Sequence, residues 1–163
     1  MKLIELTKNQ FAIVDDVDYE TLSKHKWHAK KTRHGYCAAR NATIAPGQRK
    51  TEYMHIVIAE RCGLNTDMII DHIDGDSLNN QRNNMRPATN KENCCNRLLK
   101  NYNNTAGLKG VTFAKKYNKW QAQIRHNGRR IWLGYFDDVY AAARAYDEKA
   151  IELFGEFANP NFK

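Results

Sequence analysis

The sequence predicts an α+β protein of two modules, each built from short antiparallel strands packed against helices. Three observations predict this class. Short segments in which apolar and polar residues alternate, the period of a half-buried strand, recur along the 163 residues. The last two of them are followed by an apolar stripe at helical spacing. Between the two halves, residues 92–107 are rich in Asn and Lys, as linkers are, so we predict modules of residues 1–103 and 104–163.

The composition is that of a folded protein with an anionic partner. Hydrophobic residues make up 42% and charged residues 27% of the chain. No apolar run reaches the ~20 residues of a membrane span, and no segment resembles a secretory signal. We therefore expect an intracellular protein with no membrane partner. Lys and Arg total 26 against 18 Asp and Glu, and a net charge of +8 favours nucleic acid. The cysteines are scattered and form no C-x-x-C pair, which argues against disulfides and a zinc knuckle.

The first module is predicted to begin with a β-rich part, residues 1–50, followed by a core of residues 51–103. Apolar runs predict short strands at residues 11–14, 36–40 and 51–54, and an amphipathic pattern predicts a helix at residues 55–61. Trp27, the single tryptophan of this module, is expected in the hydrophobic core rather than on a base-stacking surface.

The second module contains a predicted β-hairpin. Apolar and polar residues alternate over residues 120–125 and 130–133, and Asn127-Gly128 between them favours a type I′ turn. One face of this hairpin is apolar. The other face carries Gln121, Gln123, Arg125, Arg130 and Trp132. A large aromatic residue beside two arginines on the polar face indicates a binding surface.

A helix is predicted to follow and cover this hairpin. Residues 141–153 are mostly strong helix formers, Asp137 or Asp138 is placed to cap the N-terminus, and Gly155 is placed to end the helix. From residue 104 to residue 136 the chain has basic residues and no acidic one. We therefore expect a positively charged sheet backed by a helix. The apolar stripe of the helix consists of Val139, Ala142, Ala143, Tyr146, Ala150, Ile151 and Phe154.

The densest chemistry follows the apolar pair Ile69-Ile70, where Asp71 and His72 lead into a polar, asparagine-rich loop. Hydrolysis of a phosphodiester at neutral pH needs a base for the attacking water, and a histidine with a pKa of ~6.5 can supply it. The reaction also needs charge stabilisation, which Mg²⁺ provides while held by oxygen ligands such as a carboxylate and an amide. Taken alone, residues 71–76 also fit a plain turn or a calcium loop, although no Glu completes an EF-hand.

These residues belong to a longer pattern that resembles the HNH endonucleases of phages and introns. The matching segments are Met54-His55, residues 71–76, Asn79-Asn80, residues 84–89 and Glu92-Asn93. The resemblance implies a ββα-metal nuclease module that holds one divalent cation, Mg²⁺ with Mn²⁺ as a substitute. It implies that Asp71 and Asn93 are the metal ligands and that His72 is the general base. It further implies that Asn84 orients the base or its loop and that His55 supports the site structurally.

The second module resembles the plant APETALA2-type DNA-binding domain over residues 105–163. The matching segments are residues 109–111, 119–125, 130–136, 141–147 and 159–162. This resemblance implies a three-stranded antiparallel sheet that lies in the major groove, with one helix packed behind it. The implied DNA contacts are Lys109, Gln123, Arg125, Arg130 and Trp132. Because Lys109 replaces a frequent Arg and Gln123 a usual Glu of that family, the target sequence of the family is not carried over.

Together these features predict a metal-dependent endonuclease that hydrolyses phosphodiester bonds at a recognised site in double-stranded DNA. We expect a homing or mobile-element enzyme in the cytoplasm of a bacterial or phage-infected cell, without a small-molecule cofactor, as a monomer or dimer. The alternative is a sequence-specific DNA-binding regulator with an inactive nuclease module, against which the set Asp71, His72, Asn84 and Asn93 argues. A structured-RNA binder also fits the charge, but a groove-sized hairpin with Arg and Trp favours duplex DNA.

Overall fold

The computed structural model describes residues 1–33, 35–95, 104 and 106–162. They form two compact units, Met1–Asn90 and Lys91–Lys163, which are described separately. The predicted linker falls largely on residues 96–103, outside the described part of the chain, so a module boundary after residue 103 stays a prediction. The mixed α+β class with small antiparallel sheets is confirmed. None of the described helices has the length and apolar character that crossing a membrane requires.

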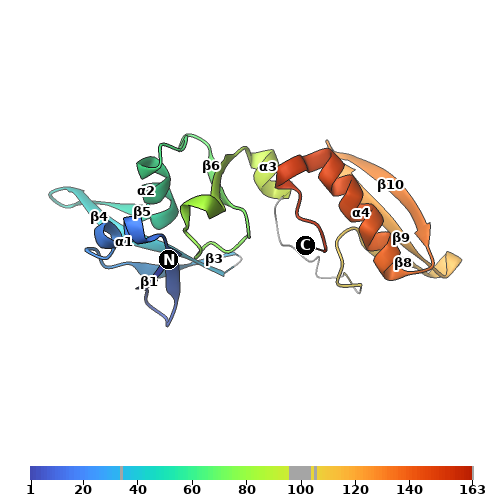
Figure 1. The fold of residues 1–163 in the computed structure, drawn as a ribbon, viewed down its shortest axis with the longest axis horizontal. Helices are drawn as coiled ribbons and strands as arrows, with labels where there is room; N and C mark the ends of the chain where they lie inside the picture. Colours follow the sequence, from blue (N-terminus) through green and yellow to red (C-terminus); the bar gives the residue numbers. More distant parts are fainter. Residues whose placement is uncertain (34, 96–103, 105, 163) are drawn as a thin grey trace. The chain divides into compact units, whose positions relative to one another are not determined.

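The first unit contains three small antiparallel sheets (Figure 1). They pair β1 with β2, β3 with β4 and β5, and β6 with β7. The helix α2 packs against β4, β5 and β6, and so joins the larger sheet to the last hairpin. The elements are β1 (Lys2–Glu5), β2 (Phe11–Val14), α1 (Asp16–Leu22), β3 (His28–Thr32), β4 (Gly35–Ala45), β5 (Gln48–Tyr53), α2 (Met54–Arg61), β6 (Ile69–His72), the 3₁₀ turn η1 (Arg82–Asn84) and β7 (Met85–Ala88).

The core of the first unit forms where α1 and α2 bury their apolar faces against the strands. Leu22, Met54 and Ile58 are almost completely buried there. Trp27 is 5% exposed and its indole N–H donates to the carbonyl of Leu22 at 2.9 Å, so its predicted core position is confirmed. Burial with a satisfied N–H is the usual state of a core tryptophan.

Two strands of this unit differ from their predicted bounds. The strand predicted at residues 36–40 is part of the longer β4, and Met54, predicted at the end of a strand, begins α2. The extension of β4 comes from pairing with β5 across the Pro46-Gly47 turn, where Gly47 has φ 78°. The outer residues of β4 are exposed or half-buried, and Ile44 is 60% exposed, so pairing with β5 and not burial in the core extends the strand there.

The second unit consists of a three-stranded antiparallel sheet, in the order β10-β9-β8, and one long helix that covers one face of it (Figure 1). The predicted turn is confirmed, because Asn127 and Gly128 both have positive φ, 49° and 75°, as type I′ requires. The elements are α3 (Asn90–Cys95), which begins at the last residue of the first unit, β8 (Val111–Ala114), the 3₁₀ turn η2 (Lys115–Tyr117), β9 (Lys119–His126), β10 (Arg129–Phe136), α4 (Val139–Phe154) and the 3₁₀ turn η3 (Gly155–Phe157).

The helix α4 is capped as predicted and packs by its alanines. The Asp138 carboxylate accepts a hydrogen bond from Ala141 N at 2.8 Å, which identifies Asp138 rather than Asp137 as the cap. Ala142 and Ala143 are fully buried against the sheet, with Val111 and Ala122 opposite. Small side chains there let the helix approach the strands closely.

One residue of the predicted apolar stripe does not belong to the core. Ile151 is 55% exposed, whereas its neighbour Ala150 is 2% exposed. Successive helical residues are turned by about 100°, so the side chain after Ala150 passes the edge of the sheet. A narrow sheet of three strands covers only a narrow stripe of the helix.

The C-terminal segment is fixed to α4 by a buried carboxylate. Asp147, 7% exposed, accepts hydrogen bonds from Asn161 N at 2.7 Å and from Phe162 N at 3.0 Å. The Asn161 side chain donates to the same carboxylate at 2.9 Å, and its oxygen accepts from Lys109 N at 2.6 Å. The chain before β8 and the chain after α4 are therefore held together.

Candidate active site and nucleic-acid interface

The hairpin of β6 and β7 places the predicted metal ligand Asp71 and the predicted base His72 at the end of a strand. In this hairpin Asp71 lies opposite Arg86 and His72 lies opposite Met85. Asp71 is 6% and His72 8% exposed, so both polar side chains are taken out of water. Because adjacent residues on a strand point to opposite faces, the two side chains enter different surroundings.

Asp71 forms a buried ion pair with its cross-strand neighbour. The Arg86 guanidinium donates to Asp71 Oδ2 from Nε at 3.1 Å and from a terminal nitrogen at 3.0 Å. A buried carboxylate needs such a partner, because an isolated charge loses several kcal/mol on leaving water. Arg86 was not singled out from the sequence, since the pairing depends on the register of the two strands.

His72 is held by Asn80, which is 1% exposed. The distance from His72 Nε2 to Asn80 Oδ1 is 3.4 Å. The Asn80 amide nitrogen donates to Leu78 O at 3.1 Å, so the amide oxygen is the atom that faces the ring. An amide oxygen only accepts, so this contact is a hydrogen bond in the tautomer that carries the proton on Nε2 and the lone pair on Nδ1.

The surroundings of His72 favour the neutral imidazole. Burial lowers the pKa of His72 below its ordinary value of 6.5, although the hydrogen bond with Asn80 and the nearby aspartates act in the opposite direction. A neutral imidazole with a defined lone pair is the form that a general base requires.

His55, on the first turn of α2, lies directly beside His72. The two ring centroids are 5.3 Å apart and the rings meet edge to face. Burial, followed by repulsion from His72, lowers the pKa of His55 from 6.5 to about 4. His55 Nδ1 is buried and has no hydrogen-bond partner among the described residues. The structure thus gives His55 a neutral, packed position next to His72.

Asn84 fixes the loop that follows β6. Its side-chain nitrogen donates to Asp74 Oδ1 at 3.0 Å and to Asn79 O at 2.8 Å, and its oxygen accepts from Asp74 N at 3.1 Å. Asp74 also accepts from Asp76 N at 2.8 Å and from the Asn79 side chain at 2.7 Å. Burial raises the pKa of Asp74, but these hydrogen bonds outweigh it and the net shift is downward.

The N-terminal strand β2 holds the far end of this loop through its backbone. Ile13 N donates to Leu78 O and Asn80 N donates to Ile13 O, both at 2.8 Å. The Asp15 carboxylate accepts from Arg82 N at 2.8 Å and from the Gln81 side chain at 3.2 Å. Asn80, which faces His72, is thus positioned by residues more than 60 positions earlier in the chain.

A second carboxylate, that of Asp18 on α1, also binds the segment that follows this loop. Asp18, fully buried, accepts from Arg82 at 2.7 and 2.8 Å and from Arg61 at 3.2 Å. Its pKa is lowered chiefly by the hydrogen bond with Arg82, against the effect of burial. The charge cluster ties α1, α2 and η1 together. No local pattern marks Asp15 or Asp18, because their partners lie far away in the sequence.

Asn93, the second predicted metal ligand, lies on α3 and is half-buried. Asp71 belongs to the first unit and Asn93 to the second. Their joint action on a cation therefore stays a prediction. Among the described residues no group of three His, Cys, Asp or Glu side chains is placed to hold a metal ion.

The predicted DNA contacts of β9 and β10 share one face of the second sheet. Trp132 lies opposite Gln123, and Arg130 lies opposite Arg125. Both arginines are exposed and Trp132 is 49% exposed, whereas the alternate residues Ile124 and Ala122 are buried toward α4. The predicted division of the hairpin into a wet and a packed face is confirmed.

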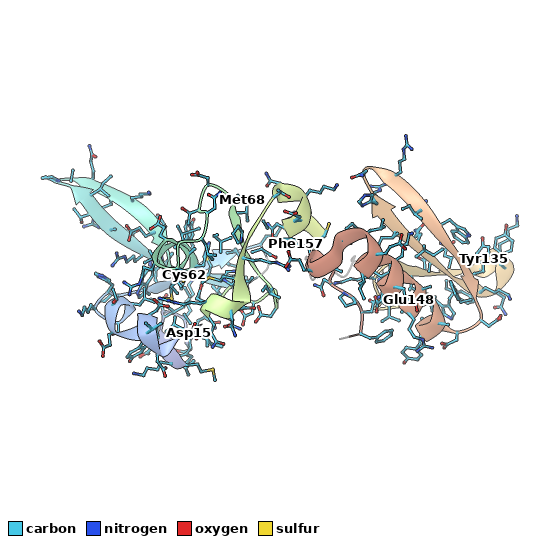
Figure 2. The ribbon with its side chains drawn as sticks, turned by 45° about the horizontal axis from the view of Figure 1, so that its top comes forward. Asp15, Cys62, Met68, Tyr135, Glu148 and Phe157 are labelled. Atoms are coloured by element: carbon cyan, nitrogen blue, oxygen red, sulfur yellow. The ribbon has the colours of Figure 1, made fainter. Side chains whose placement is uncertain are left out.

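Tyr135 joins this face through a break in the strand. The register shifts between Trp132 and Gly134, where Gly134 has φ 128°, and Tyr135 then lies opposite Gln121. Strict alternation puts residue 135 on the packed face, but Tyr135 is 42% exposed. In Figure 2 Tyr135 projects on the side of the sheet away from Glu148 of α4. The glycine was the one signal in the sequence for this bulge.

Lys109, the remaining predicted DNA contact, precedes β8 and is bonded to the C-terminal segment. Its ammonium donates to Asn159 O at 2.7 Å, so its side chain is engaged with the C-terminal segment. A DNA contact by Lys109 stays a prediction, and it requires the side chain to leave this carbonyl.

Comparison with known proteins connects the β6–β7 site to one family. Residues 52–94 match the family model described as HNH endonuclease. The chain is 31% identical over 154 residues to "Uncharacterized HNH endonuclease L560" of Acanthamoeba polyphaga mimivirus, covering 94% of this chain and 76% of that protein. It is 36% identical over 89 residues to "Protein 3.8" of Escherichia phage T7, covering 55% of this chain and 72% of that protein.

A further set of relatives, from plants, matches shorter parts of the chain. "APETALA2-like protein 2" of Oryza sativa subsp. japonica is 44% identical over 54 residues, which are 33% of this chain and 12% of that protein. Because so little of the plant protein is matched, its name says nothing about this chain as a whole. The mimivirus relative, by contrast, is matched over most of both chains. The chain therefore belongs to the HNH endonuclease family and is a DNA endonuclease.

Proposed function

We propose that this chain is a divalent-metal-dependent nuclease that cuts duplex DNA with His72 as the general base. The observation that carries the proposal is the environment of His72, an imidazole that is 8% exposed, oriented by Asn80 and adjacent in the chain to a buried carboxylate.

The donor set fits a hard divalent cation. Asp71 offers a carboxylate already oriented by Arg86, and Asn93 offers an amide oxygen. Oxygen donors from one carboxylate and one amide suit Mg²⁺, which keeps several waters, and Mn²⁺ accepts the same donors. When bound, such a cation stabilises negative charge on the scissile phosphate and on the leaving oxygen.

The proton transfer is carried by His72. Its Nδ1 lone pair takes the proton of the attacking water, while Nε2–H remains bonded to Asn80 Oδ1. The imidazolium so formed is stabilised by the nearby aspartates, which favour the charged ring. Asn84 acts on the loop rather than on the ring, by keeping Asp74 and Asn79 in place. The proton is thus accepted at a fixed position.

The second unit acts as an APETALA2-like DNA-binding module in this proposal. Support comes from the partial plant matches and from the face that gathers Arg125, Arg130 and Trp132. Phosphate contacts would position the chain and base-edge contacts would select the site. Relatives from a phage and a virus support a mobile-element role.

The direct test is cleavage of supercoiled plasmid by the full chain in Mg²⁺. We expect conversion to nicked circle first, because one HNH site per chain cuts one strand in each event. EDTA should abolish the product and Mn²⁺ should restore it, as read on an agarose gel. Tight binding of the plasmid without any product, with either metal, would favour the DNA-binding regulator.

Arg130 is expected to contribute to site selection. Alanine at Arg130 should weaken binding to a duplex selected from a random pool by about 1–3 kcal/mol, because a bidentate contact to guanine is lost. Binding to unselected duplex should fall much less. Arg144→Ala is the matched control, because Arg144 is also exposed but lies on α4 and not on the sheet. Equal losses on both duplexes would show that Arg130 contacts only phosphate, as measured by fluorescence anisotropy.

A further inference from the structure

Three aromatic side chains form an exposed ridge on the second unit. Trp132, Tyr135 and Tyr117 are 49%, 42% and 50% exposed. The ring centroids of Trp132 and Tyr135 are 4.6 Å apart, and those of Tyr135 and Tyr117 are 4.7 Å apart. The aromatic ridge, as we call these three residues, therefore runs without a gap from the middle of β10 to the η2 turn.

The chain has a specific device that places Tyr135 in this ridge. Because Gly134 has φ 128°, the strand slips by one residue and turns Tyr135 outward, while Phe136 is packed into the core with α4. A Cβ at Gly134 would meet only the Phe136 ring, at 3.6 Å, so conformation and not space selects glycine there. Exposing a tyrosine in this way costs apolar burial, and the ridge has no covering element among the described residues.

The surroundings of the ridge indicate an anionic occupant. Residues 104–136 contain no acidic side chain, and Lys116 Nζ lies 5.3 Å from the Tyr117 ring centroid. Arg130 precedes Trp132 on the same face. An exposed apolar patch within a basic field fits a polyanion that also presents apolar surface, which is the character of a nucleic-acid duplex.

The arrangement of the rings distinguishes duplex from single strand. Trp132 and Tyr135 meet at 70°, and Tyr135 and Tyr117 at 47°. A single-strand platform presents ring faces on which successive bases stack. Here each ring is turned against the next, so the ridge offers edges and partial faces instead. Edges of this kind fit deoxyribose and thymine methyl groups along the wall of a groove.

We propose that Tyr135 and Tyr117, together with Trp132, pack against the sugars and thymine methyl groups at the wall of the major groove and give the enzyme a salt-independent part of its DNA affinity. This rests on the proposed function of the second unit. The lysines and arginines around the ridge supply the salt-dependent part, because they displace counterions from phosphates.

The test measures the dissociation constant of the full chain for a fluorescein-labelled mixed-sequence duplex in EDTA over a series of salt concentrations. Tyr135→Ser should raise the dissociation constant about tenfold at every salt concentration and leave the slope against salt unchanged. Lys116→Ala should lower the slope by about one. Tyr140→Ser, which removes a tyrosine that is 56% exposed on α4, is the control and should change neither quantity.

Tyr135→Phe keeps the ring and should bind within about twofold of the parent chain. Thermal unfolding of each variant shows whether the sheet is intact. If the parent chain fails to bind the duplex, the proposed function of the second unit fails. If the parent chain binds and Tyr135→Ser binds equally well, the ridge proposal alone is overturned. Equal competition by a single strand, or a dimer that Tyr135→Ser dissociates in sedimentation, would also overturn it in favour of that other occupant.

Discussion

Replacement of His72 by alanine is expected to reduce the rate of plasmid cleavage about 10²–10⁴-fold, which is the typical contribution of a positioned general base. The loss should appear in the rate constant for cutting and not in DNA affinity, because the proposed DNA face lies on β9 and β10. Single-turnover cleavage with saturating enzyme separates the two quantities.

His25→Ala is the matched control for this variant. His25 is an exposed histidine of the same unit and lies outside the β6–β7 hairpin, so cleavage should be unchanged. Thermal unfolding of His72→Ala, compared with that of the parent chain, shows whether the variant is folded. Cleavage at the parental rate by a folded His72→Ala would remove His72 from the chemistry and reopen the assignment of the base.

Replacement of Asp18 by alanine is expected to give the largest loss of stability, about 3 kcal/mol at neutral pH. Asp18 is fully buried and accepts three hydrogen bonds from Arg61 and Arg82. Both arginine side chains are 37% exposed, so water can partly solvate them once the carboxylate is gone, which limits the loss. Urea unfolding of the full chain measures the difference, with Asp16→Ala, exposed on the same helix, as the control.

The contribution of Asp18 to stability is also expected to depend on pH, and comparison of Asp18→Ala with the parent chain measures this dependence. The pKa of Asp18 is lowered in the folded chain from 3.8, chiefly by the hydrogen bond with Arg82. Its contribution to stability is therefore complete above the unfolded pKa and is lost as the pH falls through the lower folded value. The stability difference between the parent chain and Asp18→Ala should shrink as the pH is lowered below about 4. A difference that is absent already at pH 7 would mean that desolvation of the carboxylate offsets the ion pairs.

What the sequence predicted correctly depends on neighbours along the chain. The Asn127-Gly128 turn, the helix capped by Asp138 and the exposure of Trp132 follow from period and turn chemistry within a few residues. Local physics was sufficient for these features. At Asp71 and His72 the local pattern showed only a polar pair after an apolar strand, and their predicted roles came from the family resemblance.

What the sequence could not predict depends on register and on distant partners. The Asp71–Arg86 pair requires the alignment of β6 with β7, and the outward turn of Tyr135 requires a one-residue slip. Asp18 meets Arg82 across 64 positions. A carboxylate at residue 18 has the same local pattern whether it is solvated or buried, so no period identifies it.

The backbone bond between Ile13 and Asn80 has a consequence for how such enzymes can be divided and rebuilt. The family match begins at residue 52, yet the groups that fasten the loop beside His72 come from residues 13–18. We therefore expect the smallest part of this chain that folds with the loop in place to be longer than residues 52–94. Residues 52–94 transplanted into another scaffold would contain the predicted site residues without β2, the strand that holds their loop. During synthesis, the loop between β6 and β7 reaches its final conformation only when it docks onto β2, which is made much earlier.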